Sequence, residues 1–165
     1  MAFLYTILYI FGIILCNTVF TFVPNLHLFG MEFSIGDFLV GGIYVLRDLA
    51  QREIKHYVIL AMLVGGLISY LMADKAIAIA SVTAFLVGET IDWLIYTITK
   101  KPLSQRLLIS SFISTPVDTY VFLSMAGMLD WVNFTFVMAS KIIGVLALWF
   151  SWRIRQPSKP FYSAN

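Results

Sequence analysis

Ionisable side chains lie in the middle of apolar runs that are long enough to cross a lipid bilayer, and this feature restricts the fold most. Glu89 and Asp92 lie in one such run, Asp118 lies in the next, and Lys141 lies in the last. A charged group at that depth is costly to keep away from water and usually serves a function. We therefore expect an integral membrane protein whose helices turn these side chains toward one another.

Composition supports a membrane protein rather than a soluble one. Hydrophobic residues make up 60% of the 165 residues, charged residues make up 12%, and the mean hydropathy is +0.88. At about 20 residues per span, the chain has room for six helices and almost no other domain. We expect an all-α fold with one transmembrane domain, 1–152, and a polar cytoplasmic tail, 153–165. The predicted spans are about 3–23, 33–48, 57–73, 76–99, 107–129 and 131–152.

The basic residues indicate how the chain is oriented. Nine of the eleven Lys and Arg fall in the second-to-third loop, the fourth-to-fifth loop and the tail, whereas the opposite side holds only Lys75. Because positive loops stay in the cytoplasm, both termini should be cytoplasmic, in the inner membrane. This distribution reports topology, so we expect no binding of nucleic acid.

Antiparallel hairpins are predicted to bring three of the buried charges to one depth. Asp92 and Asp118 are symmetric about residue 105, which lies in a polar turn, and Asp118 and Lys141 are symmetric about Asp130. At about 1.5 Å per residue, each lies roughly 15–20 Å from a membrane face. That is near the middle of a hydrocarbon layer about 30 Å thick.

Carboxyl groups outnumber the cation in this predicted cluster. Glu89 shares a helix face with Asp92, so at least one carboxyl should be protonated or bonded to nearby hydroxyls. The cluster either fixes helix packing as a buried ion pair or forms a pocket for a small polar ligand, and the additional acids favour the pocket. The candidate ligand-binding residues are Glu89, Asp92, Asp118, Lys141, Ser114, Thr115, Asn17, Asp48, Trp93 and Tyr120, with Phe85, Tyr96 and Phe122 as further aromatic walls.

Some polar residues also have simpler interpretations. The Asn17 amide would bond a neighbouring helix, and Asp48, at the end of the second span, could line a cytoplasmic gate. The charged segment 52–56 would be a solvated loop. We expect no catalytic residue, no cofactor and no metal site, and the single Cys16 supports neither a disulfide nor a multi-cysteine metal site.

Four segments together resemble the putative vitamin uptake transporter family. They are 38–52, the segment 80–92 with its Gly88-Glu89-x-x-Asp92 core, Ser114-Thr115-x-x-Asp118-Thr119, and Lys141. The resemblance implies uptake of queuosine precursors, 7-cyano-7-deazaguanine and its aminomethyl relative. It also implies a six-helix fold similar to the substrate-capture subunits of energy-coupling-factor transporters. The family has Gly-Asn where this chain has Ser114-Thr115.

A deazaguanine suits the predicted cluster chemically. Its adjacent N1–H and N2 donors match one carboxylate, Glu89 or Asp118, while Lys141 meets the O6 acceptor and an aromatic ring stacks on the base. One alternative is a capture subunit for another small heterocycle with a separate energising complex. An intramembrane enzyme is less favoured, because Lys141 would neutralise an aspartate dyad. Besides its contact with the lipid bilayer, the sequence leaves open whether the protein forms a homodimer or binds an energising partner.

Overall fold

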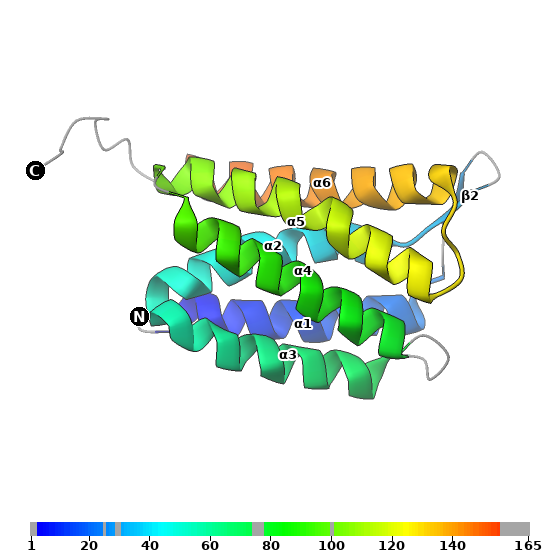
Figure 1. Ribbon diagram of the computed structural model, residues 1–165, viewed down its shortest axis with the longest axis horizontal. Helices are drawn as coiled ribbons and strands as arrows, with labels where there is room; N and C mark the ends of the chain where they lie inside the picture. Colours follow the sequence, from blue (N-terminus) through cyan, green and yellow to red (C-terminus); the bar gives the residue numbers. More distant parts are fainter. Residues whose placement is uncertain (1–2, 25, 29–30, 74–77, 100, 156–165) are drawn as a thin grey trace, which may run out of the picture.

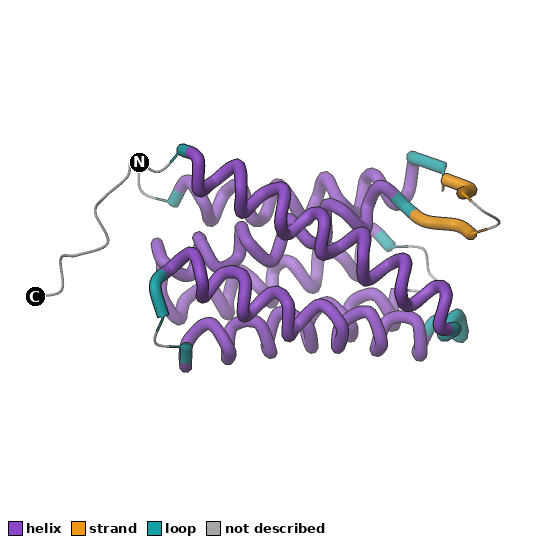
Figure 2. The backbone as a smooth tube through the Cα atoms, turned by 90° about the horizontal axis from the view of Figure 1, so that it is seen from above, coloured by secondary structure: helices purple, strands orange, loops and turns teal. Residues whose placement is uncertain are grey.

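The computed structural model describes residues 3–24, 26–28, 31–73, 78–99 and 101–155. Long helices run side by side along the longest axis of the molecule (Figure 1). The elements are α1 (Leu4–Phe22), β1 (Leu26–Leu28), β2 (Met31–Phe33), α2 (Ile35–Ile54), the 3-10 helix η1 (Lys55–Tyr57), α3 (Val58–Met72), α4 (Ala78–Ile98), α5 (Leu103–Met125) and α6 (Trp131–Ile154). The antiparallel β1–β2 hairpin, at one end of the bundle (Figure 2), lies almost entirely between the first two predicted spans.

The helices pack in a closed ring. Neighbours around it are α1, α2, α6, α5, α4 and α3, and α3 returns to α1. In Figure 1, α1 and α3 lie along one side, α5 and α6 along the other, and α2 and α4 between them. Side chains from every helix can therefore meet inside the ring.

Long apolar helices confirm the prediction of a largely helical, multi-pass membrane protein. Within the described part of the chain, five helical stretches have the length and hydropathy to cross a membrane. One of them is the 38-residue stretch Ile35–Met72, which contains α2, η1 and α3. Many large apolar side chains of α1 and α3 are exposed, for example Ile7, Phe11 and Leu71. Such faces suit contact with lipid.

The second helix differs most from the sequence prediction. It begins at Ile35 behind a capping box, in which the Ser34 hydroxyl accepts from the Gly36 N–H and the Asp37 carboxylate accepts from the Ser34 N–H. It then continues to Ile54, past the predicted end at residue 48. The predicted end followed the first charges in the sequence, but those charges have partners inside the bundle.

The charged segment after residue 51 is therefore not simply a solvated loop. Glu53, near the end of α2, accepts hydrogen bonds from the backbone N–H groups of Tyr5 and Thr6 at 3.0 and 2.9 Å. These are orphan donors in the first turn of α1, which Phe3 does not cap with its side chain. The end of α2 is thus tied to the beginning of α1.

Two glycines let α2 and α6 touch backbone to backbone. A Cβ placed on Gly41 would overlap the carbonyl oxygen of Lys141, and one placed on Gly144 would overlap the carbonyl oxygen of Phe38. Small residues at such crossings are a general means of close helix packing in membranes. This crossing fixes the position of Lys141 on the inner side of the ring.

Candidate functional site

A cavity of about 690 Å³ lies inside the ring and contains four of the predicted ligand-binding residues. They are Asn17 on α1, Glu89 on α4, Asp118 on α5 and Lys141 on α6. The cavity extends from these side chains to residues near the end of the bundle that carries the β-hairpin, among them Thr21, Met72 and Asn133. A polar chamber surrounded by apolar helices is typical of a binding site for a small molecule.

Lys141 and Asp118 form a buried ion pair at the cavity wall. The Lys141 Nζ lies 2.5 Å from Asp118 Oδ2, and both side chains are 5% exposed. The Tyr44 hydroxyl lies beside the same carboxyl group, and a Cβ on Gly88 would come within 2.5 Å of that hydroxyl and 2.7 Å of Asp118 Cβ. The buried ion pair that the sequence analysis weighed as the packing alternative is therefore present, between Asp118 and Lys141, and Gly88 gives the pair room against α4.

A second buried cluster, centred on Arg47, lies next to the cavity. Arg47 is completely buried and forms ion pairs with Asp48 at 2.8 Å, with Glu89 at 3.4 Å, and with Asp92. Its Nη1 also donates to Gln51 Oε1 at 2.7 Å. We call Arg47, Asp48, Glu89 and Asp92 the Arg47 cluster. One cation with three carboxylates makes this the most highly charged part of the interior.

Glu89 belongs both to the wall of the cavity and to the Arg47 cluster. Its Oε2 accepts a hydrogen bond from the Tyr9 hydroxyl at 3.1 Å and faces Arg47 Nε. Its Oε1 has no hydrogen-bond partner among the described residues, although it is buried. Since Glu89 also lines the cavity, one carboxyl group joins the chamber to the Arg47 cluster.

Comparison with known proteins decides the family. A family model described as putative vitamin uptake transporter matches residues 2–152. The chain belongs to this family of membrane transporters. No curated protein and no solved structure matches it. Family membership points to transport rather than to covalent chemistry, so the cavity of this vitamin uptake transporter is its candidate substrate site.

In the structure, the charged residues that we predicted as one cluster form two groups, one around Lys141 and one around Arg47. Gly88, and not Asp92, lies level with Asp118 on α5, and Asp92 lies one turn away, with Arg47. The hairpin symmetry took residue 105 as the middle of the turn, but α5 begins at Leu103, so residue 105 lies inside the helix. The middle of the turn lies earlier in the chain, and a residue about one turn before Asp92 is therefore level with Asp118.

Asp48 also belongs to the Arg47 cluster rather than to a helix end. The Ser110 hydroxyl on α5 donates to Asp48 Oδ2 at 2.7 Å, and Asp48 is fully buried. Sequence reasoning missed Arg47, which we counted among the cytoplasmic loop charges. The signal that could have located it was the spacing Tyr44, Arg47, Asp48, which places three polar side chains on one helical face.

Asn17 serves the packing role that we predicted, and it also lines the cavity. Its Nδ2 donates to Ser69 Oγ on α3 at 3.1 Å, which ties α1 to α3. Asp37 was missed as a cavity residue, although it lines the chamber beside its capping contact with Ser34. The capping pattern Ser34-x-x-Asp37 marked its position, but not its inward direction.

Four other predicted site residues do not line the cavity. Ser114 and Thr115 are buried, and both hydroxyls donate to the Ser111 carbonyl within α5. Trp93 packs edge-on against His56, with ring centroids 5.9 Å apart. Tyr120 is 55% exposed on the outside of the bundle. The aromatic side chains that do line the chamber are Phe20, Tyr44, Phe85 and Phe122.

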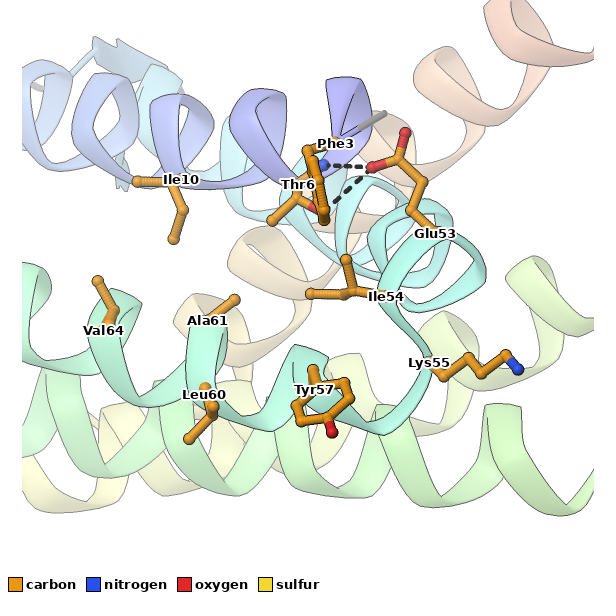
Figure 3. Close-up of a pocket in the computed structure, with 10 residues that line it drawn as sticks. All are labelled: Phe3, Thr6, Ile10, Glu53, Ile54, Lys55, Tyr57, Leu60, Ala61 and Val64. Carbon is orange, nitrogen blue, oxygen red and sulfur yellow. Dashed lines mark hydrogen bonds between the residues drawn. The ribbon is translucent and has the colours of Figure 1, made fainter. Parts of the chain in front are cut away.

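A groove of about 620 Å³ also lies between the beginnings of α1 and α3 (Figure 3). Its walls are mostly apolar, for example Ile10, Leu60 and Val64. Its half-buried acid, Glu53, accepts hydrogen bonds from Tyr5 and Thr6. Among the described residues, no buried polar atom without a partner belongs to the lining of this groove, whereas Glu89 supplies one to the inner cavity.

Proposed function

We propose that this transporter imports a queuosine precursor, 7-cyano-7-deazaguanine or 7-aminomethyl-7-deazaguanine. The observation that carries the proposal is the placing of two carboxyl groups and a lysine in one cavity. Asp118 accepts the N1–H and N2 donors of the base, and Lys141 donates to O6. This set matches the hydrogen-bonding edge of a guanine-like ring.

The size and walls of the cavity support the same ligand. Its volume of about 690 Å³ falls within the range of roughly 300–1,000 Å³ that is typical of small-molecule sites. Phe85 on α4 and Phe122 on α5 line it and offer rings for stacking on a flat base.

The charge distribution supports an orientation in which the cavity opens to the outside. We propose that α2 and α3 cross the membrane separately, which gives six spans with both termini in the cytoplasm. The hairpin end of the bundle then faces outward, so the cavity receives substrate from outside. The Arg47 cluster closes the inner end. This arrangement is similar to that expected for the capture subunits of energy-coupling-factor transporters.

The test is uptake in a cell that cannot make the precursor, with queuosine in tRNA as the readout. Wild-type protein should restore queuosine from external 7-cyano-7-deazaguanine. Asp118→Asn and Lys141→Met should abolish it while both proteins still insert in the membrane, because each removes one partner of the buried pair. If the wild-type protein does not restore queuosine, the substrate assignment is wrong. If both variants take up substrate normally, the binding site is not at Asp118 and Lys141.

A second candidate function is a capture subunit for another heterocycle that depends on an energising complex. The described chain has short connections between its helices, such as the three-residue η1, which leave little room for its own ATPase. Co-purification with an ATPase partner, and loss of uptake when that partner is deleted, would favour this alternative. Uptake by the purified protein alone in liposomes would exclude it.

A further inference from the structure

The interior of the bundle holds more acids than bases. Among the described residues, five carboxyl side chains are buried, but only two cationic side chains are buried. The acids are Asp37, Asp48, Glu89, Asp92 and Asp118, and the bases are Arg47 and Lys141. If all were ionised, the interior would carry an excess of three negative charges. Because each uncompensated buried ion costs several kcal/mol, some of these carboxyl groups must carry protons.

Glu89 is the acid best placed to take up and release a proton. Asp118 is held by Lys141, and Asp92 and Asp48 lie against Arg47 without lining the cavity. Glu89 Oε1 has no hydrogen-bond partner among the described residues, and Glu89 lines the chamber. A proton from the cavity can therefore reach this oxygen without breaking a hydrogen bond.

The groups that face Glu89 come from several helices. The Tyr9 hydroxyl on α1 donates to Oε2, and Arg47 on α2 attracts the ionised form. The other facing groups are Tyr44 and Asp48 on α2, Asp92 on its own helix α4, and Asp118 on α5, with Lys141 of α6 and Asp37 of α2 further along the cavity. The sequence of α3 contains no charged residue. The ionised form is thus favoured chiefly by Arg47 and opposed by the neighbouring carboxylates.

We propose that import is coupled to a proton and that Glu89 carries it. The proposal rests on the function above: Asp118 and Lys141 hold the substrate, and Glu89 exchanges the proton. A proton from outside water binds the Glu89 carboxylate and makes it neutral. Arg47 then loses one of its three ionic partners, which weakens the Arg47 cluster at the inner end of the cavity. When that end opens, the proton leaves to the cytoplasm, and Glu89 pairs with Arg47 again.

This cycle moves one proton inward with each substrate. When the substrate is a neutral base, the import of one proton with each substrate molecule supports an inside-to-outside substrate ratio of about ten for each pH unit by which the outside is more acidic. Because the cycle also moves one positive charge inward, an inside-negative potential should drive it too. Replacement of Glu89 by Gln keeps the neutral shape but removes the exchangeable proton.

The transport test uses purified protein in liposomes with radiolabelled 7-cyano-7-deazaguanine and a clamped membrane potential. Wild-type protein should accumulate substrate about tenfold per pH unit and lose the accumulation with a protonophore. Glu89→Gln should still exchange labelled for unlabelled substrate, but should not accumulate it. Glu53→Gln is the control, since its amide oxygen can still accept from α1, and it should behave as wild type. Accumulation by Glu89→Gln that equals wild type, or wild-type uptake that ignores the pH gradient, would overturn the proposal.

A spectroscopic test does not depend on the substrate. Infrared difference spectra on acidification should contain a buried carboxylic C=O band that is missing in Glu89→Gln and present in Glu53→Gln. An unchanged band in Glu89→Gln would refute Glu89 as the proton site. If no exchange of 7-cyano-7-deazaguanine occurs but the Glu89 band is present, the substrate assignment fails and the proton site stands.

Discussion

Removal of the Arg47 charge should destabilise the protein more than any other single change in the site. Arg47→Met keeps the length of the side chain but leaves Asp48, Glu89 and Asp92 without their cation. Breaking a buried ion pair by removing one partner costs about 3–5 kcal/mol. For a chain of this size, each kcal/mol corresponds to about 2–4 °C in Tm. We therefore expect a decrease in Tm of about 6–20 °C.

The assay is thermal unfolding in detergent, followed as loss of the monodisperse peak in size-exclusion chromatography after heating. Arg52→Met is the matched control, because Arg52 is exposed on the same helix, and a surface change of this kind costs about 0.5 kcal/mol or less. Adding Asp92→Asn to Arg47→Met should recover part of the loss, since it removes one unpaired carboxylate. A Tm for Arg47→Met equal to that of Arg52→Met would refute the importance of the Arg47 cluster.

The remaining predictions concern packing, capping and the outer face. Gly144→Ala should lower the free energy of unfolding in detergent by about 1–3 kcal/mol, because its Cβ would overlap a carbonyl oxygen of α2. Gly42→Ala is the control and should be neutral, because its Cβ would lie 3.6 Å from the nearest side-chain atom. Equal losses in the two variants would contradict the close crossing. Glu53→Ala should cost about 0.5–2 kcal/mol by uncapping α1, seen as faster hydrogen exchange in the first turn of α1 alone. Tyr120→Ala should leave uptake unchanged, because this side chain points away from the cavity, and a loss of uptake with normal insertion would contradict that.

The charged residues show how far sequence reasoning reaches. Asp118 and Lys141 could be paired because both lie deep in long apolar runs and their helices meet at a short turn. The position of Arg47 could not be predicted, because a hydropathy argument ends the predicted span at the first dense run of charges. Only the packing of α2 against α4 shows that the Arg47 guanidinium forms ion pairs with Glu89 and Asp92. The depth of Asp92 was missed for a smaller reason: residue 105, which we took as the middle of the turn, lies inside α5.

The aromatic residues show a second limit. Phe122 and Tyr120 are two positions apart on α5, and the first lines the cavity while the second lies on the outer face. Both are compatible with a membrane helix, so composition does not distinguish them. The direction of each side chain depends on how α5 is rotated against α4 and α6, and that rotation follows from contacts far apart in the sequence. Small residues such as Gly88 fix it by allowing Asp118 to approach α4.

The glycine crossing of α2 and α6 limits which parts of the molecule can move. The two backbones touch at Gly41 and Gly144, so these helices cannot slide or turn against each other without a steric clash. They form a rigid frame, and the α4–α5 hairpin lies against it. The Lys141–Asp118 ion pair joins the frame to that hairpin. The ion pairs of Arg47 with Glu89 and Asp92 join the same two parts. A rocking motion of the hairpin would therefore strain both sets of contacts, and the Lys141–Asp118 bond lies at the wall of the inner cavity.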